Sequence, residues 1–228
     1  QRYFKNNNKN KKILLLNGAP SCGKDFAADY IINKFGQAKK DKFARVLKER
    51  THALYGYAWR PHDYYEDVKE IATEDFFGLT PRQAYINVSE VYFKPLHGKD
   101  IFGKILSKEL DKYDWDIIVI SDSGFVEEAE VLINKYGSEN VILIKVIRPG
   151  YSFKGDSRNY IELNPNICNI TITNDGTETY LKIIDTIVTD IVTMNSKSVR
   201  SSLAKNTNAR LNRKKKPKAP NKGQEKNL

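Results

Sequence analysis

Residues Lys12 to Asp25, KILLLNGAPSCGKD, decide the fold of this 228-residue chain. The apolar run 13–16 is followed by Gly18, and Gly23 and Lys24 complete the spacing G-x-x-x-x-G-K of a phosphate-binding loop. Such a loop joins a buried strand to a helix, so that backbone N–H groups and the helix dipole surround an anion. We predict that the phosphates of a nucleotide bind to Gly18, Ala19, Pro20, Ser21, Cys22, Gly23, Lys24 and Asp25.

The residue that follows Lys24 departs from the common motif. Ser or Thr usually stands there and holds Mg²⁺ through its hydroxyl, whereas this chain has Asp25. The departure either spoils the loop or marks a particular family, so the other motifs of the chain have to decide between the two.

Composition indicates a globular protein. The chain has 40% hydrophobic and 29% charged residues, and no apolar run approaches the roughly 18 residues that cross a membrane. Two cysteines are too few for a disulfide framework or a zinc site, and no signal peptide is visible. We therefore expect a cytoplasmic protein with no membrane partner.

The positive charge is concentrated at the two ends of the sequence. Residues 196–228 hold eleven Lys and Arg and one acidic residue, whereas residues 13–195 hold 22 basic and 27 acidic residues. We expect a basic N-terminal arm (1–11), a folded domain (12–195) and a disordered basic tail (196–228) that binds nucleic acid non-specifically through its charge.

Apolar runs alternate with helical patterns along the folded domain. This indicates an α/β fold of the P-loop NTPase type, three layers deep, with a central parallel sheet and helices on both faces. Strands are predicted at 13–17, 116–121, 141–147 and 167–173, together with a short second strand that ends at 42–44. Helices are predicted at 22–35, 45–55, 62–75, 81–93, 101–111, 126–136 and 177–194. Residues 45–112 form a helical insertion that binds the acceptor, and residues 149–162 form a short lid.

Two charged residues stand where ligands are expected. Asp122 follows the apolar run DIIVIS, at the carboxyl end of a central strand, so it is either a Mg²⁺ ligand or the N-cap of the helix near Val126. Arg82 lies in the first turn of a helix that starts at Thr80-Pro81, a poor place for a cation without an anionic partner. We predict that Arg82 binds a phosphate, and the alternative is a solvated helix face.

Two loops complete the candidate site. The polar segment after residue 147 carries Arg148 and Arg158, and phosphoryl transfer needs mobile cations that close over the transferring group, although loop arginines are also common. Asn174-Asp175-Gly176 follows the last strand. It is either a tight turn alone or the turn by which a nucleotide kinase approaches the adenine ring.

In this order the motifs resemble those of the bacteriophage deoxynucleoside monophosphate (dNMP) kinases, within the P-loop nucleoside monophosphate kinase group, over roughly residues 12–191. The matching positions are Gly23-Lys24-Asp25, Phe43-Ala44 with Lys48, Thr80–Gln83 with Glu90, Asp122 with Phe125 and Glu128, Arg148-Pro149, and Asn174–Gly176. The family's loop also reads Gly-Lys-Asp, so Asp25 supports the resemblance. Two places depart from the family: Gly124 replaces its arginine, and its lid signature is matched only loosely by Ser157, Arg158 and Glu162.

The resemblance implies transfer of the γ-phosphate of ATP to a dNMP in an infected bacterial cell. It implies that Lys24 and the loop hold the donor phosphates, that Asp25 and Asp122 hold Mg²⁺, and that the turn with Asn174 and Gly176 contacts the donor. The residues it implies for the acceptor are Phe43, Lys48, Arg82, Gln83 and Glu90. The residues it implies for charge neutralisation during transfer are Lys24, Arg82, Arg148 and Arg158.

Two other readings stay open at this point. A kinase-derived protein that binds nucleic acid or is associated with the virion is favoured by the basic tail and by Gly124. A P-loop kinase with a different acceptor would show the same loop. The sequence leaves open the base preference, the choice between ribose and deoxyribose, and whether the protein is a homodimer.

Overall fold

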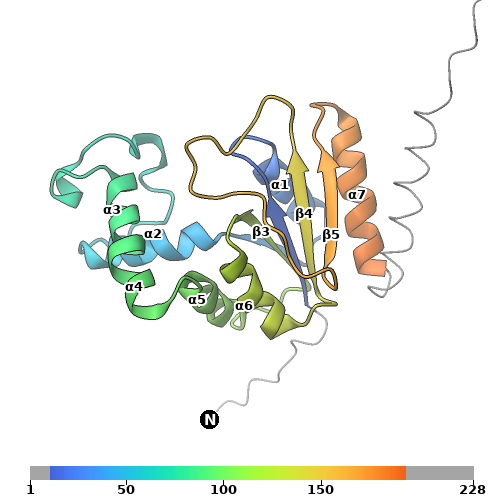
Figure 1. The fold of residues 1–228 in the computed structure, drawn as a ribbon, viewed down its shortest axis with the longest axis horizontal. Helices are drawn as coiled ribbons and strands as arrows, with labels where there is room; N and C mark the ends of the chain where they lie inside the picture. Colours follow the sequence, from blue (N-terminus) through green and yellow to red (C-terminus); the bar gives the residue numbers. More distant parts are fainter. Residues whose placement is uncertain (1–10, 194–228) are drawn as a thin grey trace, which may run out of the picture.

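The computed structural model describes residues 11–193, which form a parallel five-stranded sheet between two layers of helices (Figure 1). The strand order is β2-β3-β1-β4-β5. The strands are β1 (Lys12–Asn17), β2 (Ala38–Asp41), β3 (Ile117–Ser123), β4 (Val141–Ile147) and β5 (Cys168–Thr173). The predicted basic tail, and the basic arm apart from Lys11, lie outside the described residues.

The helices and turns follow the strands along the chain. The α-helices are α1 (Lys24–Lys34), α2 (Phe43–Leu54), α3 (Pro81–Asn87), α4 (Lys94–His97), α5 (Ile101–Leu110), α6 (Val126–Tyr136) and α7 (Glu178–Thr193). The other helical segments are the 3₁₀ turns η2 (Glu66–Val68) and η3 (Glu74–Phe76) and the π-helical η4 (Val88–Phe93).

Different helices cover the two faces of the sheet. On one face, Leu14 and Leu16 of β1 pack with α1 and α7, and on the other, Ile13 and Leu15 pack with α2, α5 and α6. Because successive side chains of a strand point to opposite faces, a strand buried on both faces needs a continuous apolar run. The predicted α/β fold with three layers is confirmed, and the loop between β1 and α1 gives it the arrangement of a P-loop kinase fold.

The second strand ends slightly earlier than predicted. It spans Ala38–Asp41, whereas Lys42 is the N-cap residue of α2 and Phe43 starts that helix. In the sequence AKKD only Ala38 and Asp41 are buried, so no apolar run marks this edge strand.

The helix predicted at 62–75 is wrong. The segment holds η2 and then, in part, η3, and it closes over a small aromatic cluster in which Phe76 and Tyr65 are buried. Aromatic packing there replaces the helix that the charge pattern had indicated.

The helix predicted at 81–93 begins as expected and then changes character. Thr80 and Gln83 form a capping box, with Gln83 N donating to Thr80 Oγ1 (3.1 Å) and Thr80 N donating to Gln83 Oε1 (2.9 Å). From Val88 the chain continues as the π-helical η4 and then as α4, at a distance from the sheet (Figure 1). By contrast α5, the last helix of the insertion, packs against α6 within the core.

Candidate functional site

The phosphate loop, residues 18–25, joins β1 to α1, and its glycines have no room for side chains. A Cβ added at Gly18 would lie 2.4 Å from Val146 O, and one added at Gly23 would lie 2.4 Å from Asn174 Nδ2. Gly23 also has a φ of 102°, which favours glycine. The two glycines therefore fix the path of the loop and leave its backbone open to an anion.

Three side chains hold the phosphate loop from outside. Asn174 Nδ2 donates to Cys22 O (2.9 Å), the Tyr180 hydroxyl donates to Gly23 O (3.0 Å), and Arg148 Nη1 donates to Ser21 O (3.2 Å). All three bonds end on carbonyl oxygens, so they leave the loop N–H groups to an anion. Two of the predicted site residues, Asn174 and Arg148, thus contact the loop directly. Gly176 N donates to Asn174 Oδ1 (2.9 Å), which brings the predicted turn to the same place.

Lys24 is buried at the start of α1 and folds back on its own loop. Its Nζ donates to Ala19 O (2.6 Å) and lies 3.8 Å from Cys22 Sγ. Burial lowers the pKa of Lys24, and the positive charge of Arg158 acts in the same direction. A phosphate in the loop would supply the anionic partner that a cation at a helix N-terminus lacks.

Asp25 lies among cations beside the phosphate loop. Its Oδ1 accepts a hydrogen bond from Ser121 Oγ (3.0 Å) and pairs with Lys40 (3.0 Å) and Lys42 (2.8 Å). Burial acts to raise the pKa of Asp25, but the bonds from Lys42 and Lys40 outweigh it and lower the pKa to about 2. The carboxylate is therefore ionised at neutral pH.

Asp122 holds the start of α2. It lies inside β3, where its Oδ1 and Oδ2 accept hydrogen bonds from Phe43 N and Ala44 N, both at 2.9 Å. The expected alternative of an N-cap for α6 is wrong, since Phe125 is the N-cap residue of α6. Asp122 satisfies instead the first N–H groups of a helix that is distant in sequence.

The chemistry of Asp25 and Asp122 fits Mg²⁺. The negative charges of Asp25 and Asp122 both act on Arg158, which brings the two carboxylates to the same part of the site. Mg²⁺ prefers oxygen ligands and is usually held by one or two carboxylates together with substrate phosphates. Within residues 11–193 no group of three or more His, Cys, Asp and Glu residues is placed to hold a metal ion.

A cleft of about 500 Å³ lies between the η4–α4 segment and the start of α6, and we call it the acceptor cleft. Its lining residues are Glu90, Lys94, Pro95, Lys99, Phe125, Glu127 and Ser157. Lys94 Nζ pairs with Glu90 (2.6 Å) and lies 4.7 Å from the centroid of the Phe125 ring. The cleft thus combines two lysines, two carboxylates and an aromatic ring.

Most of the predicted acceptor residues lie elsewhere. Of the five, Glu90 is the one that lines the acceptor cleft in the described part of the chain. Arg82 pairs with Glu70 (2.5 Å) on an exposed surface, Lys48 pairs with Glu66, and the Gln83 side chain closes the capping box. Phe43 is buried at the start of α2.

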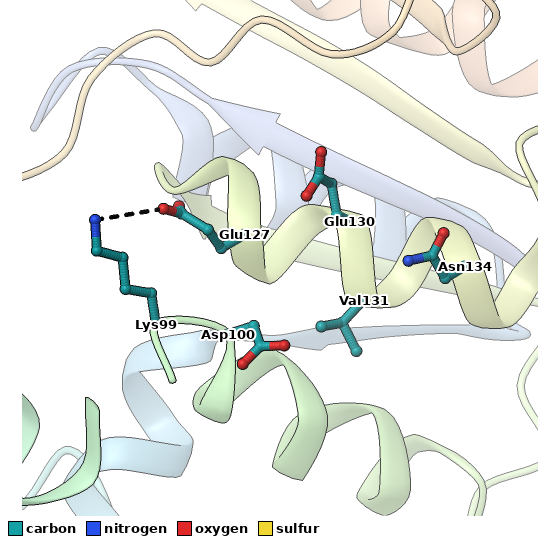
Figure 2. A pocket seen from close by; sticks show the side chains of 6 residues that line it. All are labelled: Lys99, Asp100, Glu127, Glu130, Val131 and Asn134. Carbon is teal, nitrogen blue, oxygen red and sulfur yellow. Dashed lines mark ion pairs between the residues drawn. The ribbon is translucent and has the colours of Figure 1, made fainter. Parts of the chain in front are cut away.

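A smaller pocket of about 200 Å³ adjoins the acceptor cleft, since Lys99 and Glu127 line both (Figure 2). Figure 2 shows Glu127 and Glu130 on α6, above Asp100 at the start of α5. Lys99 Nζ lies 3.9 Å from Glu127 Oε1. The pocket is open and mostly acidic, so it does not suit a phosphate.

Arg158, in the predicted lid, acts through its charge on Lys24 of the phosphate loop. Its Nε and Nη2 donate to the two carboxylate oxygens of Asp156, at 2.9 and 2.6 Å. The bond with Asp156 raises the pKa of Arg158, and the negative charges of Asp122 and Asp25 act in the same direction. Arg158 is therefore one of the charges that surround Lys24.

The sequence analysis missed several residues of the site. Lys94 follows Glu90 by four positions on one helical segment, so an i,i+4 ion pair could have been predicted. Lys40 and Lys42 gave no such signal, because their contact with Asp25 depends on which strands are neighbours. Asn17 and Tyr180 were also missed, because their hydrogen bonds to Ser123 O and Gly23 O join segments that are distant in the sequence.

Comparisons with known proteins add little to this geometry. No protein-family model matches the chain, and no curated protein matches it. Among the solved structures that match is an unliganded sugar kinase from Janibacter sp. HTCC2649, with 13% identity and a TM-score of 0.39, covering 77% of this chain and 93% of the other. No helix within residues 11–193 is long and apolar enough to cross a membrane.

Proposed function

We propose that this chain is an ATP-dependent kinase that transfers a phosphoryl group to a dNMP. The observation that carries the proposal is the position of Arg158, whose neighbour Ser157 lines the acceptor cleft and whose charge acts on Lys24 of the phosphate loop. Ser157 and Phe125 line the cleft, and their neighbours Arg158 and Gly124 lie against each other, with the charge of Arg158 acting on Lys24. A donor phosphate in the loop would therefore face an acceptor in the cleft.

The donor side of the proposal uses the loop and its supports. The loop N–H groups and Lys24 hold the outer phosphates of ATP, and the turn at Asn174–Gly176 lies at the adenine end. Asp25 and Asp122 would hold Mg²⁺, which neutralises phosphate charge when it is bound. Asp25 is suited to this because its pKa is lowered to about 2, with burial opposed by the two lysines.

The acceptor side uses the cleft. Lys94 and Lys99 supply positive charge for the acceptor phosphate, and Phe125 offers a ring face for the base. Glu90 provides hydrogen-bond acceptors for the amino or imino groups of a base. A volume of about 500 Å³ lies within the usual range for small-molecule sites.

The proposed reaction needs no protein nucleophile. Phosphoryl transfer depends on alignment of donor and acceptor and on stabilisation of the charge that spreads over the transferring group. Lys24 and Arg158 supply that positive charge. The buried surroundings of Lys24 strengthen each interaction relative to water.

The test is an acceptor screen with purified full-length protein, ATP and Mg²⁺. Each dNMP and NMP is offered in turn, together with a 5′-hydroxyl oligonucleotide and small phosphate esters, and formation of ADP and of the phosphorylated acceptor is measured. We expect turnover with at least one dNMP and a loss of about 10³-fold in the Lys24→Ala variant. Failure of the native protein with every dNMP would refute the proposed acceptor, and turnover with another compound would identify the correct one.

The basic tail is a separate proposal that rests on sequence charge. Its eleven Lys and Arg residues would bind nucleic-acid phosphates with a steep salt dependence. A variant that ends at residue 195 should keep kinase activity and lose DNA binding. Equal DNA binding by both forms would rule out the tail as the binding segment.

A further inference from the structure

A buried asparagine connects the predicted lid to the sheet. Asn17, the last residue of β1, is fully buried. Its Nδ2 donates to Ser123 O (2.9 Å) and to Asn159 O (2.9 Å), and its Oδ1 accepts from Ile161 N (3.0 Å). A buried amide with three partners is expensive to break, so it fixes the segment 159–161.

Further contacts hold the same segment. Ile161 is buried in the core cluster that contains Ile13, and the Tyr160 hydroxyl donates to Val146 O (3.3 Å). Asn159 N also approaches Gly124 O at 3.5 Å. Earlier in the predicted lid, Phe153 packs against the core cluster that contains Leu14, and its ring centroid lies 5.0 Å from that of Tyr160.

Gly124 completes the arrangement because it leaves room for the Arg158 side chain. A Cβ added at Gly124 would lie 2.5 Å from Cβ and Cγ and 2.7 Å from Cδ of Arg158. These atoms belong to the stem of the arginine, close to a backbone that the contacts of Asn159 fix. The stem cannot swing aside as the end of a flexible side chain could, so a side chain at 124 and Arg158 exclude each other.

We propose that Asn17 and Gly124 are positioning residues, which hold Arg158 beside Lys24 before substrates bind. Arg158 would then act as a permanent part of the site, and closure of a lid would not be needed to deliver it. The inference deepens the proposed function and rests on it, because the charge that Arg158 meets is that of the transferring phosphate. Pre-set charge of this kind stabilises a transition state without reorganisation.

The first experiment needs no kinase activity. Hydrogen exchange is measured at the amide of Ile161, in the full-length protein and in the Asn17→Ser variant, with Leu143 of β4 as a reference for the sheet. We expect Ile161 to be protected in the native protein and to exchange at least tenfold faster in the variant, with Leu143 unchanged. Fast exchange of Ile161 in the native protein would overturn the inference even if the enzyme is active.

The second experiment uses kinetics and a variant that removes no charge. Gly124→Ala adds one methyl group against the Arg158 stem, and Gly36→Ala is the matched control, because a Cβ there meets nothing within 4 Å. We expect Gly124→Ala to lower kcat by about tenfold with KM for both nucleotides within about twofold, as for an interaction made in the transition state. Equal kcat values for both alanine variants would contradict the inference.

The third experiment exchanges the two residues. Arg158→Gly should lower kcat by about 10²- to 10³-fold, as expected for loss of a charge-stabilising group. In the double variant Gly124→Arg/Arg158→Gly, the new arginine can occupy the vacated space, and we expect kcat to recover at least tenfold. A double variant no better than Arg158→Gly would refute the steric exchange. If the native protein phosphorylates no acceptor, the proposed function fails. The hydrogen-exchange rates of the first experiment still decide the role of Asn17.

Discussion

The proposed donor and acceptor sides of the site are built in different ways. On the donor side, glycine conformations and buried hydrogen bonds to loop carbonyls determine where each atom lies. On the acceptor side, ion pairs between side chains such as Lys94 and Glu90 line an open cleft beside a helix that changes from α to π. The contrast indicates that the phosphate position is set by the backbone, whereas the acceptor position is set by side chains that can be exchanged.

The largest effect that this contrast predicts belongs to Lys24. Lys24→Ala removes the buried cation of the loop, and we expect kcat/KM for ATP to fall by about 10³-fold, at the upper end for loss of one charge-stabilising donor. Steady-state kinetics with the best acceptor measures it. The control is Lys34→Ala at the exposed end of the same helix, which should stay within about twofold. A loss of less than tenfold would show that the loop does not dominate donor binding.

Removal of a support of the loop should have the next largest effect. Asn174→Ala leaves Cys22 O without its donor and opens space beside Gly23. We expect nucleotide affinity to weaken by about tenfold to a hundredfold, in line with the loss of one buried hydrogen bond. Titration calorimetry with a non-hydrolysable ATP analogue gives the value. Unchanged affinity would mean that the loop keeps its shape without its outer partners.

A smaller and more selective effect is expected in the acceptor cleft. Lys94→Ala should raise KM for the dNMP by about fivefold and leave KM for ATP unchanged, because one partly exposed cation contributes about 1 kcal/mol. Lys182→Ala, on the exposed surface of α7, is the control. Parallel changes in both KM values would contradict the separation of the two sides.

The last prediction concerns stability, not catalysis, at the border between the two sides. Burial raises the pKa of Glu128 to about 8, and Asp122 and Glu127 act in the same direction against Lys94 and Arg158. The folded state therefore keeps a proton that the unfolded chain releases near pH 4, so the free energy of unfolding falls as pH rises from about 4 to about 8, by up to about 1.4 kcal/mol per pH unit.

Glu128→Gln tests this dependence because it removes the titrating group. Urea unfolding at about pH 5 and about pH 8 should show that the variant gains stability relative to the native protein as pH rises. Parallel stability curves for the two proteins would show that the Glu128 carboxyl is already charged in the folded protein.

The sequence predicted the donor side well because its signals are local. The apolar run 13–16 and the spacing of Gly18, Gly23 and Lys24 describe one strand, one turn and the start of one helix. The runs at β3 and β4 are equally local, so the sheet and its covering layers could be predicted. The end of strand β2 could not, because its four residues are held by pairing with β3 rather than by their own hydrophobicity.

The acceptor side was predicted poorly because its contacts join distant segments. Arg82 was expected to bind phosphate on the strength of its place in a helix, but Glu70 supplies the anion. Ser157 and Phe125 meet at the cleft only because the chain after β4 returns across the sheet. Asp122 shows both outcomes. Its position near the carboxyl end of β3 was predictable, but its bonds to Phe43 N and Ala44 N were not.

Through those two bonds Asp122 connects α2 to the sheet, in addition to being a candidate metal ligand. The segment that carries the acceptor cleft begins with α2, and the first turn of α2 is attached to the sheet through one carboxylate. A cation that binds to those carboxylate oxygens would weaken the hydrogen bonds from Phe43 N and Ala44 N. Under the proposed function, binding of Mg²⁺ with the donor would thereby be coupled to the orientation of α2, at the start of the acceptor segment.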